Sequence, residues 1–505
     1  RKGILEGVAA AIVAAGGKVA DFNKRAPKVA APKGVEKVTT DVLVVGGGAG
    51  GLAAAVRAAT QGAHVILIEK RPNIGGATQL NAGTLVATGS RYQREVMKET
   101  KDSPELLAKD IFRAGENKND PVLVKMVGEK AGGVVDWLIY DLKIPYGPAA
   151  TQYPDHSANR QLGVTGRSVN WLKLMSQKLN ENGGKIMTDT RAQEFIRDKA
   201  GNVVGVKATM TNGQKIDFSA KSVVLASGGY GANRAMLPKK VASYLFYGLD
   251  SETGDGLAMG KKIGAGTINL DLVKQYPQGV ETLPHHALAA TASSTDTMKK
   301  SGAIYVNRDG KRIVDELAGL GMLTKITEAQ KDSIMYIVMD KVAWKQYVAK
   351  SLEDKLVAAP SDLDKWAKIV NNGYPVMATS AKLADAAKTM GINAKGLQAT
   401  IARWNGFVKA GADKDFGRKV LMPFGEGPYY IVEQKPRFQT TLGGLKANAD
   451  MQILNKKGQP IGNLFGAGCV VGGANGSDSL TAMMNSWAII SGVVAGDSAV
   501  KNLKK

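Results

Sequence analysis

The sequence predicts an α/β protein whose first domain is a dinucleotide-binding sheet, and three features of one stretch carry this prediction. Val42–Val45 is a run of branched apolar residues, which is typical of a strand buried on both faces. A second run of this kind, Val65–Ile68, ends at Glu69. The segment between them begins with three glycines at G-x-G-x-x-G spacing and continues with helical spacing of its apolar residues; the glycines are Gly46, Gly48 and Gly51.

Each part of this stretch has a physical role in binding a pyrophosphate. Gly46 permits a tight turn, Gly48 lets backbone approach the phosphates, and Gly51 lets the helix pack closely on the strand. The helix N-terminus offers unpaired N–H groups and the positive end of its dipole. Glu69, about twenty residues further on, is placed to accept hydrogen bonds from a ribose. The strand–turn–helix–strand context therefore predicts a bound dinucleotide.

Composition limits the class of protein. A chain of 505 residues can form two or three domains. It is 44% hydrophobic without an apolar run long enough to span a bilayer, so we expect a soluble globular protein with no stable membrane insertion. The net charge is +22, from 67 basic and 45 acidic residues. This excess fits an anionic substrate, an acidic redox partner or a solvated basic surface, and no nucleic-acid-binding motif accompanies it.

Metal and disulfide chemistry find little support in the sequence. Cys469 is the single cysteine, which excludes an internal disulfide, a C-x-x-C-H haem site and a cysteine-ligated cluster. Four histidines in the whole chain argue against a zinc site. We therefore expect no metal, and redox chemistry would depend on an organic cofactor with electrons supplied from outside.

The first 37 residues are interpreted as a signal-like segment and a linker. Arg1–Gly17 has a basic start and a short Ala/Val run, and is close to a twin-arginine export signal with Lys2 in the place of the second arginine. This predicts a periplasmic or exported bacterial protein. The alternative is a small N-terminal helix packed on the body, which would fit a cytoplasmic protein. Asp21–Lys37 is rich in Lys, Pro and Ala, as linkers are.

The remaining chain is divided by a change of character after Leu270. Residues 38–270 are predicted as the first part of the nucleotide-binding domain, 271–430 as an inserted domain of helices and short strands, and 431–505 as the second part. We expect the following elements: helices after Ser103 and Asp120, a strand at Lys185–Thr188, a hairpin of Val203–Met210 with Gln214–Phe218, a strand at Ser222–Ala226, a helix from Gly254, a strand–turn at Asn463–Gly468 and a helix at Ser479–Gly496. Residues 146–167 read as irregular.

Several motifs in a fixed order resemble those of one flavoprotein family. They are VVGGGAGG, IEKRPNIGGAT, SPELLAKD, VVLASGGYGAN, TGDGLAMGKKIGA, GAIYVNRDGKRIVDE, TLGGL and NLFGAGCVVGG. From about Thr40 onward the chain resembles the FAD-containing fumarate reductase and succinate dehydrogenase flavoproteins. Within these it resembles the soluble flavocytochrome c fumarate reductase and urocanate reductase type, without the haem domain. The resemblance implies a two-part Rossmann-like FAD-binding domain interrupted by an α+β capping domain.

The resemblance also implies how FAD is held. No histidine lies near the IGG motif, so we expect the FAD to be non-covalent. Cys469 stands where the family commonly has a glutamate. The residues expected to bind FAD are Gly46, Gly48, Gly51, Glu69, Lys70, Gly76, Ala77, Thr78, Ala82, Gly83, Ala192, Ser227, Gly228, Asp255, Gly468 and Met484.

The catalytic side of the resemblance is incomplete. In the family, flavin N5 passes a hydride to an alkene carbon, an arginine donates the proton, and arginines and histidines bind the carboxylates. Leu320 falls at the donor arginine, Ser479 at a carboxylate-binding arginine and Thr440 at a histidine; a leucine cannot donate a proton. No arginine lies between Arg312 and Arg403. Fumarate is therefore an unexpected substrate.

Four residues remain as candidates for catalysis: Tyr276, Asp296, Lys299 and His286. The resemblance places Tyr276 in the pocket, and Asp296 and Lys299 at the relay pair of the family. Tyr276 and Asp296 resemble the pair that holds the imidazole end of the substrate in urocanate reductase. The alternatives are that Asp296 and Lys299 form a surface ion pair and that His285 and His286 lie in a surface loop. Arg437 is interpreted as a surface residue or as a replacement for a missing carboxylate-binding arginine; Arg160 and Arg167 are possible anion binders.

Three functions follow as hypotheses. The first is an FAD-dependent oxidoreductase that reduces the activated C=C bond of an unsaturated, acidic substrate other than fumarate. Its electrons would come from an external carrier, a c-type cytochrome or another redox protein, in anaerobic respiration. The second is an electron-transfer flavoprotein that docks a cytochrome and has lost fumarate-type chemistry. The third is a dehydrogenase of the ketosteroid type with a tyrosine pair drawn from Tyr276, Tyr429 and Tyr430.

Overall fold

The structure of the protein is a computed structural model that describes residues 34–505, so the signal-like segment and most of the linker lie outside the described residues. The described chain forms two compact units. The nucleotide unit comprises 34–238, Gly248–Lys274 and Thr440–Lys505; the insert unit comprises Lys239–Tyr247 and Gln275–Gln439. The functional boundaries at 270/271 and 430/431 stay predictions.

The nucleotide unit is built on an eight-stranded sheet with the order β21-β22-β9-β1-β2-β6 and with β7 and β8 attached beside β9. Strands β22, β9, β1, β2 and β6 are parallel, and Val45 pairs with both Ile68 and Leu225. Strands β1, β2 and β9 therefore end at the same level of the sheet. The glycine turn follows β1 at this level. The strand bounds are β1 Val35–Val45, β2 Val65–Ile68, β6 Lys185–Met187, β7 Thr190–Arg197, β8 Val203–Met210, β9 Lys215–Leu225, β21 Gln452–Leu454 and β22 Pro460–Gly466.

The predicted hairpin is confirmed, because β8 and β9 pair antiparallel across the turn at 211–214. The two strands expected at Gln214–Phe218 and Ser222–Ala226 are one continuous strand. Its first half pairs with β8 and with the start of β1, and its second half pairs in parallel with β1 and β22. Ser219 and Ala220, which lie between the predicted strands, pair with Thr39 and Thr40 of β1, and Ser222 pairs with Val42 in the same register.

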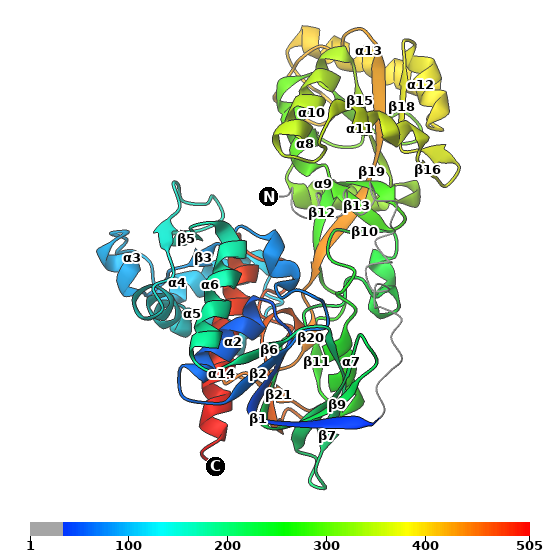
Figure 1. Cartoon of the computed structure of the whole chain (residues 1–505). Coiled ribbons are helices and arrows are strands. Elements are labelled where there is room, and N and C mark those ends of the chain that lie inside the picture. The colour runs from blue at the N-terminus through cyan, green and yellow to red at the C-terminus, as the bar shows by residue number, and fades with distance from the viewer. Residues whose placement is uncertain (1–33) are drawn as a thin grey trace. The chain divides into compact units, whose positions relative to one another are not determined.

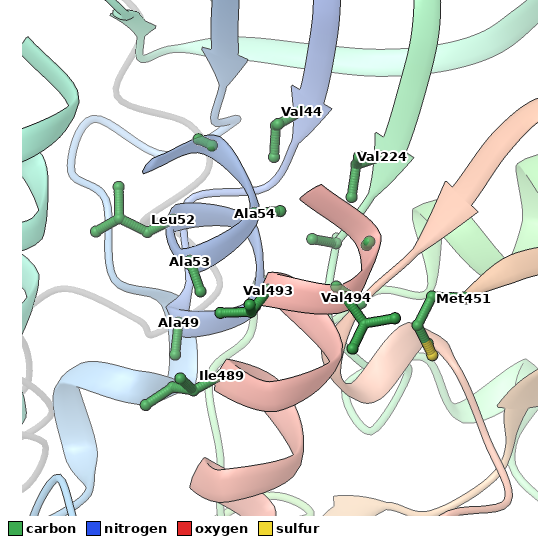
Figure 2. Packing of buried hydrophobic residues seen from close by; sticks show 14 of the residues in the cluster. Val44, Ala49, Leu52, Ala53, Ala54, Val224, Met451, Ile489, Val493 and Val494 are labelled. Atoms are coloured by element: carbon green, nitrogen blue, oxygen red, sulfur yellow. The ribbon is translucent and has the colours of Figure 1, made fainter. Parts of the chain in front are cut away.

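Helices α2 (Ala49–Ala59) and α14 (Met483–Asn502) pack against each other beside this sheet (Figure 1). Figure 2 shows Ala49, Ala53 and Val493 among the apolar side chains buried at this contact. A Cβ on Gly492 would lie 2.4 Å from the Gly50 oxygen, so only glycine permits this approach. Helix α14 begins four residues later than predicted, because Ala482 before it has a left-handed backbone with φ +72°.

Other helices surround the nucleotide unit. Ser103 and Asp120 cap α4 and α5 as predicted, since their side chains accept hydrogen bonds from Leu106 N and Val122 N. The stretch predicted as irregular contains two short strands of a three-stranded sheet. The bounds are α3 Arg91–Glu95, α4 Pro104–Ala114, α5 Pro121–Asp136, η3 Trp137–Asp141, α6 Arg167–Glu181, α7 Asp255–Lys262, η2 Gly76–Leu80, η8 Gly468–Val470, β3 Leu85–Val86, β4 Tyr146–Pro148, β5 Gln161–Val164, β11 Thr267–Ile268 and β20 Gly444–Leu445.

The insert unit has its own seven-stranded sheet, with the order β10-β13-β12-β19-β15-β14 and with β18 beside β19. Alternate residues of β15 enter two separate hydrophobic clusters, so both faces of this strand are buried. The bounds are β10 Leu245–Phe246, β12 Val273–Leu283, β13 His286–Ala289, β14 Ile304–Val306, β15 Met335–Met339, β18 Met377–Ser380, β19 Tyr429–Thr441, β16 Val370–Asn371, β17 Tyr374–Pro375, α8 Thr291–Lys300, α9 Leu320–Ala329, α10 Lys341–Glu353, α11 Pro360–Asp364, α12 Leu383–Thr389 and α13 Ala394–Ala410.

Within residues 34–505, none of the helices combines the length and apolar character that crossing a bilayer requires. The same described residues contain no group of three or more His, Cys, Asp or Glu side chains arranged to hold a metal ion.

Candidate functional site

A cavity lies at the carboxyl ends of three parallel strands of the nucleotide unit. Its wall includes Val45 and Gly46 after β1, Glu69 after β2, and Ser227 and Gly228 after β9. This is the position at which open α/β sheets bind their ligands. Further parts of the wall come from η2, from the start of α7 and the segment before it, and from η8 with the residue before it: Gly76, Ala77, Thr78, Ser251, Glu252, Asp255, Ala467, Gly468 and Cys469.

The three motif glycines have different surroundings. Gly46 has φ +112°, and a Cβ there would lie 2.1 Å from the Ala226 oxygen. A Cβ on Gly51 would lie 1.8 Å from the Gly46 oxygen, so both positions are fixed by packing. For Gly48, which lines the cavity and precedes α2, the nearest such contact is 3.6 Å away, at Thr78 Oγ1. The backbone of Gly48 is therefore open to a ligand at the N-terminus of α2, as a pyrophosphate requires.

Glu69 is held at the cavity wall by backbone groups. Its side chain is buried, Oε1 accepts a hydrogen bond from Gly47 N at 3.1 Å, and Oε2 accepts one from Arg71 N at 2.9 Å. A carboxylate has about four acceptor sites, so it can still accept hydrogen bonds from ribose hydroxyls. Thr78 Oγ1 accepts from Ala49 N at 2.9 Å and so ties η2 to the start of α2.

Three charged side chains form a cluster on the cavity wall. Asp255 accepts both guanidinium hydrogen bonds of Arg191 at 2.9 Å, and Lys70 Nζ lies 3.3 Å from its Oδ2. Burial alone would raise the pKa of Asp255, but the hydrogen bond from Arg191 and the charge of Lys70 lower it overall. Burial lowers the pKa of Lys70 despite the opposing charge of Asp255. Arg191 was not predicted, although it directly precedes the predicted Ala192.

The cavity wall contains a buried hydroxyl without a partner in the described chain and glycines with open space beside them. Ser227 Oγ is buried and has no hydrogen-bond partner within the described chain. A Cβ built on Gly76 or Gly228 would meet no atom of residues 34–505 within 4 Å. An orphaned hydroxyl beside open glycine backbone suits a group that is rich in hydrogen-bonding atoms, so these residues fit a dinucleotide cofactor.

Most of the predicted FAD-binding residues line this cavity; they are Gly46, Gly48, Glu69, Lys70, Gly76, Ala77, Thr78, Ala192, Ser227, Gly228, Asp255 and Gly468. Gly51 lies behind the turn, and Ala82 and Gly83 follow η2, where Gly83 N donates to Asn81 Oδ1 at 2.8 Å. Met484 lines a second, smaller cavity that shares Cys469 with the first. The individual contacts of these residues with FAD remain predictions.

Two further wall residues have strongly shifted acidities. Burial raises the pKa of Glu252 to about 7, although a backbone hydrogen bond from Leu249 and the charges of Lys70 and Arg71 oppose this. Burial also raises the pKa of the Cys469 thiol to about 12, so the thiol stays protonated and unreactive at neutral pH. Glu252 was not predicted, because it lies outside every glycine motif.

The candidate catalytic residues lie in the insert unit. Tyr276 is in β12, His286 begins β13, and Asp296 and Lys299 are in α8. His286 Nδ1 donates to the Pro284 carbonyl at 2.8 Å. The ion pair that Asp296 makes is with Lys300, at 3.1 Å, and it also accepts a hydrogen bond from Gln346. The suggested Asp296–Lys299 pair is therefore corrected, because Lys299 is exposed and the i,i+4 lysine takes its place.

Arg437 is buried beside Tyr276, so its interpretation as a surface residue is wrong. Its exposed fraction is 5%. The guanidinium carbon lies 4.4 Å from the ring centroid of Tyr276 and 5.2 Å from that of Tyr247, and Nη2 donates to Thr291 Oγ1 at 3.1 Å. Burial lowers the pKa of Arg437 to about 10. Arg437 follows Pro436, and both residues lie within β19.

Two other buried arginines, Arg160 and Arg312, are paired with carboxylates. Arg160 donates to Asp102, at 2.7 Å and 3.0 Å, and to Asp110 at 2.7 Å. Arg312 donates to Glu316 and to Asp413 with distances of 2.6–3.0 Å. Both guanidinium groups are thus neutralised by carboxylates and serve the fold, which argues against Arg160 as an anion binder.

Leu320 and Ser479, which stand where the family pattern has arginines, have different surroundings. Leu320 is the first residue of α9 and is 40% exposed. Ser479 is buried, and its carbonyl accepts a hydrogen bond from Lys274 Nζ at 3.1 Å. Lys274 also lies 2.7 Å from Asp478 Oδ1. A lysine therefore contacts the Ser479 backbone, but Asp478 neutralises its charge.

The glycine turn at the start of α2, the fixed carboxylate after β2 and the polar cavity between them define a dinucleotide-binding protein of the α/β class. The family model described as "FAD binding domain" matches residues 41–483, and the chain belongs to this family. It is an FAD-dependent oxidoreductase of the enoate reductase type.

Characterised relatives support this assignment. The chain is 33% identical to the urocanate reductase of Eggerthella lenta, over 98% of this chain and 80% of that protein. It is 31% identical to a fumarate reductase (cytochrome) of Shewanella frigidimarina, over 92% of this chain and 78% of that protein. The open conformation of a flavocytochrome c3 fumarate reductase matches with a TM-score of 0.75 and 27% identity, over 93% of this chain and 79% of that one. The predicted fold class, family resemblance and FAD cofactor are confirmed.

Proposed function

We propose that this flavoprotein reduces the activated C=C bond of an unsaturated acid that is larger than, or differs in charge from, fumarate. One observation carries the proposal: the FAD cavity is formed, while Leu320 and Ser479 stand where the family pattern has arginines for a dicarboxylate. The relatives named for urocanate and fumarate both act on unsaturated acids, which supports this substrate class.

The chemistry divides between the cofactor and the insert unit. FAD, when bound and reduced, supplies a hydride to the electron-poor alkene carbon. The neighbouring carbon must then receive a proton, and we propose the Tyr276 hydroxyl as its source. The Arg437 guanidinium, 4.4 Å from the Tyr276 ring, would stabilise the phenolate that this transfer leaves. His286, Asp296 and Lys299 remain candidates for returning the proton to Tyr276.

We propose an external redox protein as the electron source, with a c-type cytochrome as the first candidate. The net charge of +22 favours an acidic partner. The cytochrome in the name of the Shewanella relative and the signal-like sequence at Arg1–Gly17 support a periplasmic role in anaerobic respiration.

Steady-state reduction of an enoate panel tests the proposal. Anaerobic holoenzyme with reduced benzyl viologen should oxidise the viologen when crotonate, trans-cinnamate or urocanate is added, and only weakly with fumarate. One molecule of the saturated acid should accumulate for every two molecules of reduced viologen that are oxidised. If none of these acids is reduced, the electron-transfer alternative gains support, and salt-sensitive co-purification with a haem protein would favour it.

A further inference from the structure

Helix α8 begins in the insert unit without the groups that usually satisfy a helix N-terminus. Its N-cap is Ala290, its first turn holds no acidic residue, and no side chain of the described chain caps it. Such an end presents unpaired N–H groups and the positive end of the helix dipole. Thr291 and Ala292 are only half-buried, so this end can be reached from solvent.

A buried arginine donates a hydrogen bond to the first residue of the same helix. Arg437 Nη2 donates to the hydroxyl of Thr291, which itself donates to the Pro277 carbonyl at 3.0 Å. Arg437 Nε and Nη1 are buried and have no hydrogen-bond partner among residues 34–505. The guanidinium is therefore anchored to the helix end by one nitrogen, while its other donors are available.

The two tyrosine rings leave these donors free to bind. Rings at 4.4 Å and 5.2 Å from the guanidinium carbon interact with the cation through their faces, whereas Arg437 forms hydrogen bonds along its edge. Tyr247 and Tyr276 are each half-buried, so both side chains beside the Arg437 guanidinium are partly exposed.

Other buried arginines of the insert unit lie close to a carboxylate. Arg312 is paired with Glu316 and Asp413. Arg418 also has an Nε without a partner among the described residues, but it lies 3.6 Å from Glu316 and donates to three backbone carbonyls. A buried guanidinium without an anion is strongly unfavourable. Its presence at Arg437, beside an uncapped helix end, is explained if an anion completes the site.

We propose that Arg437 and the N-terminus of α8 form a binding site for one carboxylate group, which is the carboxylate of the unsaturated acid. This assignment rests on the proposed function. A planar carboxylate can accept two parallel N–H bonds from a guanidinium edge, and its charge is favoured at a helix N-terminus. One anionic site would select monocarboxylates, in agreement with the missing arginines at Leu320 and Ser479.

Binding to the oxidised holoenzyme tests this site without turnover. Thermal unfolding is measured with crotonate and trans-cinnamate, and with crotonamide and cinnamamide as uncharged isosteres, at constant ionic strength. We expect the acids to raise Tm in a concentration-dependent way, which gives an apparent Kd, and the amides to have little effect. Equal shifts by acid and amide, or no shift with either acid, would overturn the site.

Arginine variants then test whether the rise in Tm that the acids cause depends on Arg437. Arg437→Gln should raise the apparent Kd of the acids by at least about tenfold. Arg437→Lys should raise it by less, because lysine keeps the charge but lacks the paired N–H donors of the guanidinium. Arg308→Gln is the matched control: Arg308 also lies over a ring, that of Tyr374 at 5.4 Å, but Asp332 neutralises it at 3.1 Å. It should leave the Kd unchanged.

Ligand-free stability separates binding from a structural role. Arg437→Gln removes an unpaired buried charge and should not lower the Tm of the ligand-free protein, whereas Arg312→Gln removes the cation that Glu316 and Asp413 share and should lower it. An acid effect that persists in Arg437→Gln would overturn the inference even if enoates are reduced. An Arg437-dependent acid effect without reduction of any enoate would support the site and reject the proposed function.

Discussion

At the scale of single residues, two arginines of the insert unit show how burial changes a guanidinium. For Arg312, burial acts to lower the pKa, but the hydrogen bonds that it donates to Glu316 and Asp413 raise the pKa above its usual value. For Arg437, burial lowers the pKa to about 10, and the two tyrosines oppose it only weakly. The charge of Arg312 is stabilised by its carboxylate partners. The buried charge of Arg437 has an unfavourable desolvation energy, which a bound anion would offset.

Tyr276 should matter for chemistry more than for binding. Replacing Tyr276 with Phe keeps the ring against Arg437 and removes the hydroxyl proton, so kcat for the best enoate should fall by about 100-fold with little change in KM. FAD content should remain as in the wild type, which is the control for intact folding. A Tyr276→Phe variant with full kcat would show that another group donates the proton.

Glu433 should make stability depend on pH. Burial raises its pKa to about 7, opposed first by Lys435, whose Nζ is 3.6 Å away and also lies 3.1 Å from Glu281. The folded state therefore retains a proton that the unfolded chain releases above its ordinary pKa of 4.5, and the free energy of unfolding falls as the pH rises from that value to about 7.

Glu433→Gln removes this titration. Between pH 5 and pH 8, the free energy of unfolding of the wild type should fall by about 2 kcal/mol more than that of the variant. Urea unfolding at both pH values measures the difference. The same pH dependence in both proteins would place the raised pKa on another group of the Glu281–Lys435–Glu433 cluster.

At the scale of elements, the turn between β1 and α2 separates folding from cofactor binding. Gly48→Ala places a Cβ 3.6 Å from its nearest neighbour, with φ already at −76°, so the fold should tolerate it. The methyl group would occupy the space beside the phosphates, and FAD affinity should fall by at least about tenfold. Fluorescence titration of the apoprotein with FAD measures this affinity.

Gly51→Ala is the contrasting variant. Its Cβ would lie 1.8 Å from the Gly46 oxygen, so helix α2 must move away from β1. We expect loss of soluble, cooperatively folding protein rather than a selective loss of FAD. Equal FAD affinity in the wild type and Gly48→Ala would contradict the placement of the phosphates at this turn.

Elements with strong local patterns were predictable from the sequence. Val65–Ile68 is β2 with the expected bounds, because a branched apolar run has few alternatives in a parallel sheet. The start of α14 was misplaced, because the left-handed backbone at Ala482 depends on tertiary packing. The residues between the two predicted strands showed no strand pattern, yet Ser219 and Ala220 pair with β1, and the two predicted strands are one strand, β9.

The FAD cavity was more predictable than the insert unit for a related reason. Glycines such as Gly46 are fixed by backbone geometry that leaves a sequence motif, whereas Glu252 and Arg191 reach the cavity through the tertiary fold alone. The burial of Arg437 depends on Tyr247 and Tyr276, which are distant in the sequence. No local sequence pattern predicts this contact of Arg437 with the two tyrosines.

At the scale of the whole molecule, the net charge of +22 should steer electron donors. Reduction by an acidic redox protein should be fast at low salt and should slow steeply as ionic strength rises, because the Debye length falls to about 8 Å at physiological salt. A basic donor of similar potential should show the reverse trend. Stopped-flow reduction of the FAD between 0.01 M and 0.5 M NaCl measures both, and a rate independent of salt would argue against an acidic partner.

Reoxidation of the reduced holoenzyme by an unsaturated acid tests the central claim most directly. The FAD is reduced with light under argon and mixed in a stopped-flow instrument with crotonate, trans-cinnamate, urocanate or fumarate. At least one of the first three acids should restore the oxidised FAD spectrum within seconds and yield one saturated acid per FAD, while fumarate reacts far more slowly. If the FAD stays reduced with every acid, the protein is not a reductase of unsaturated acids.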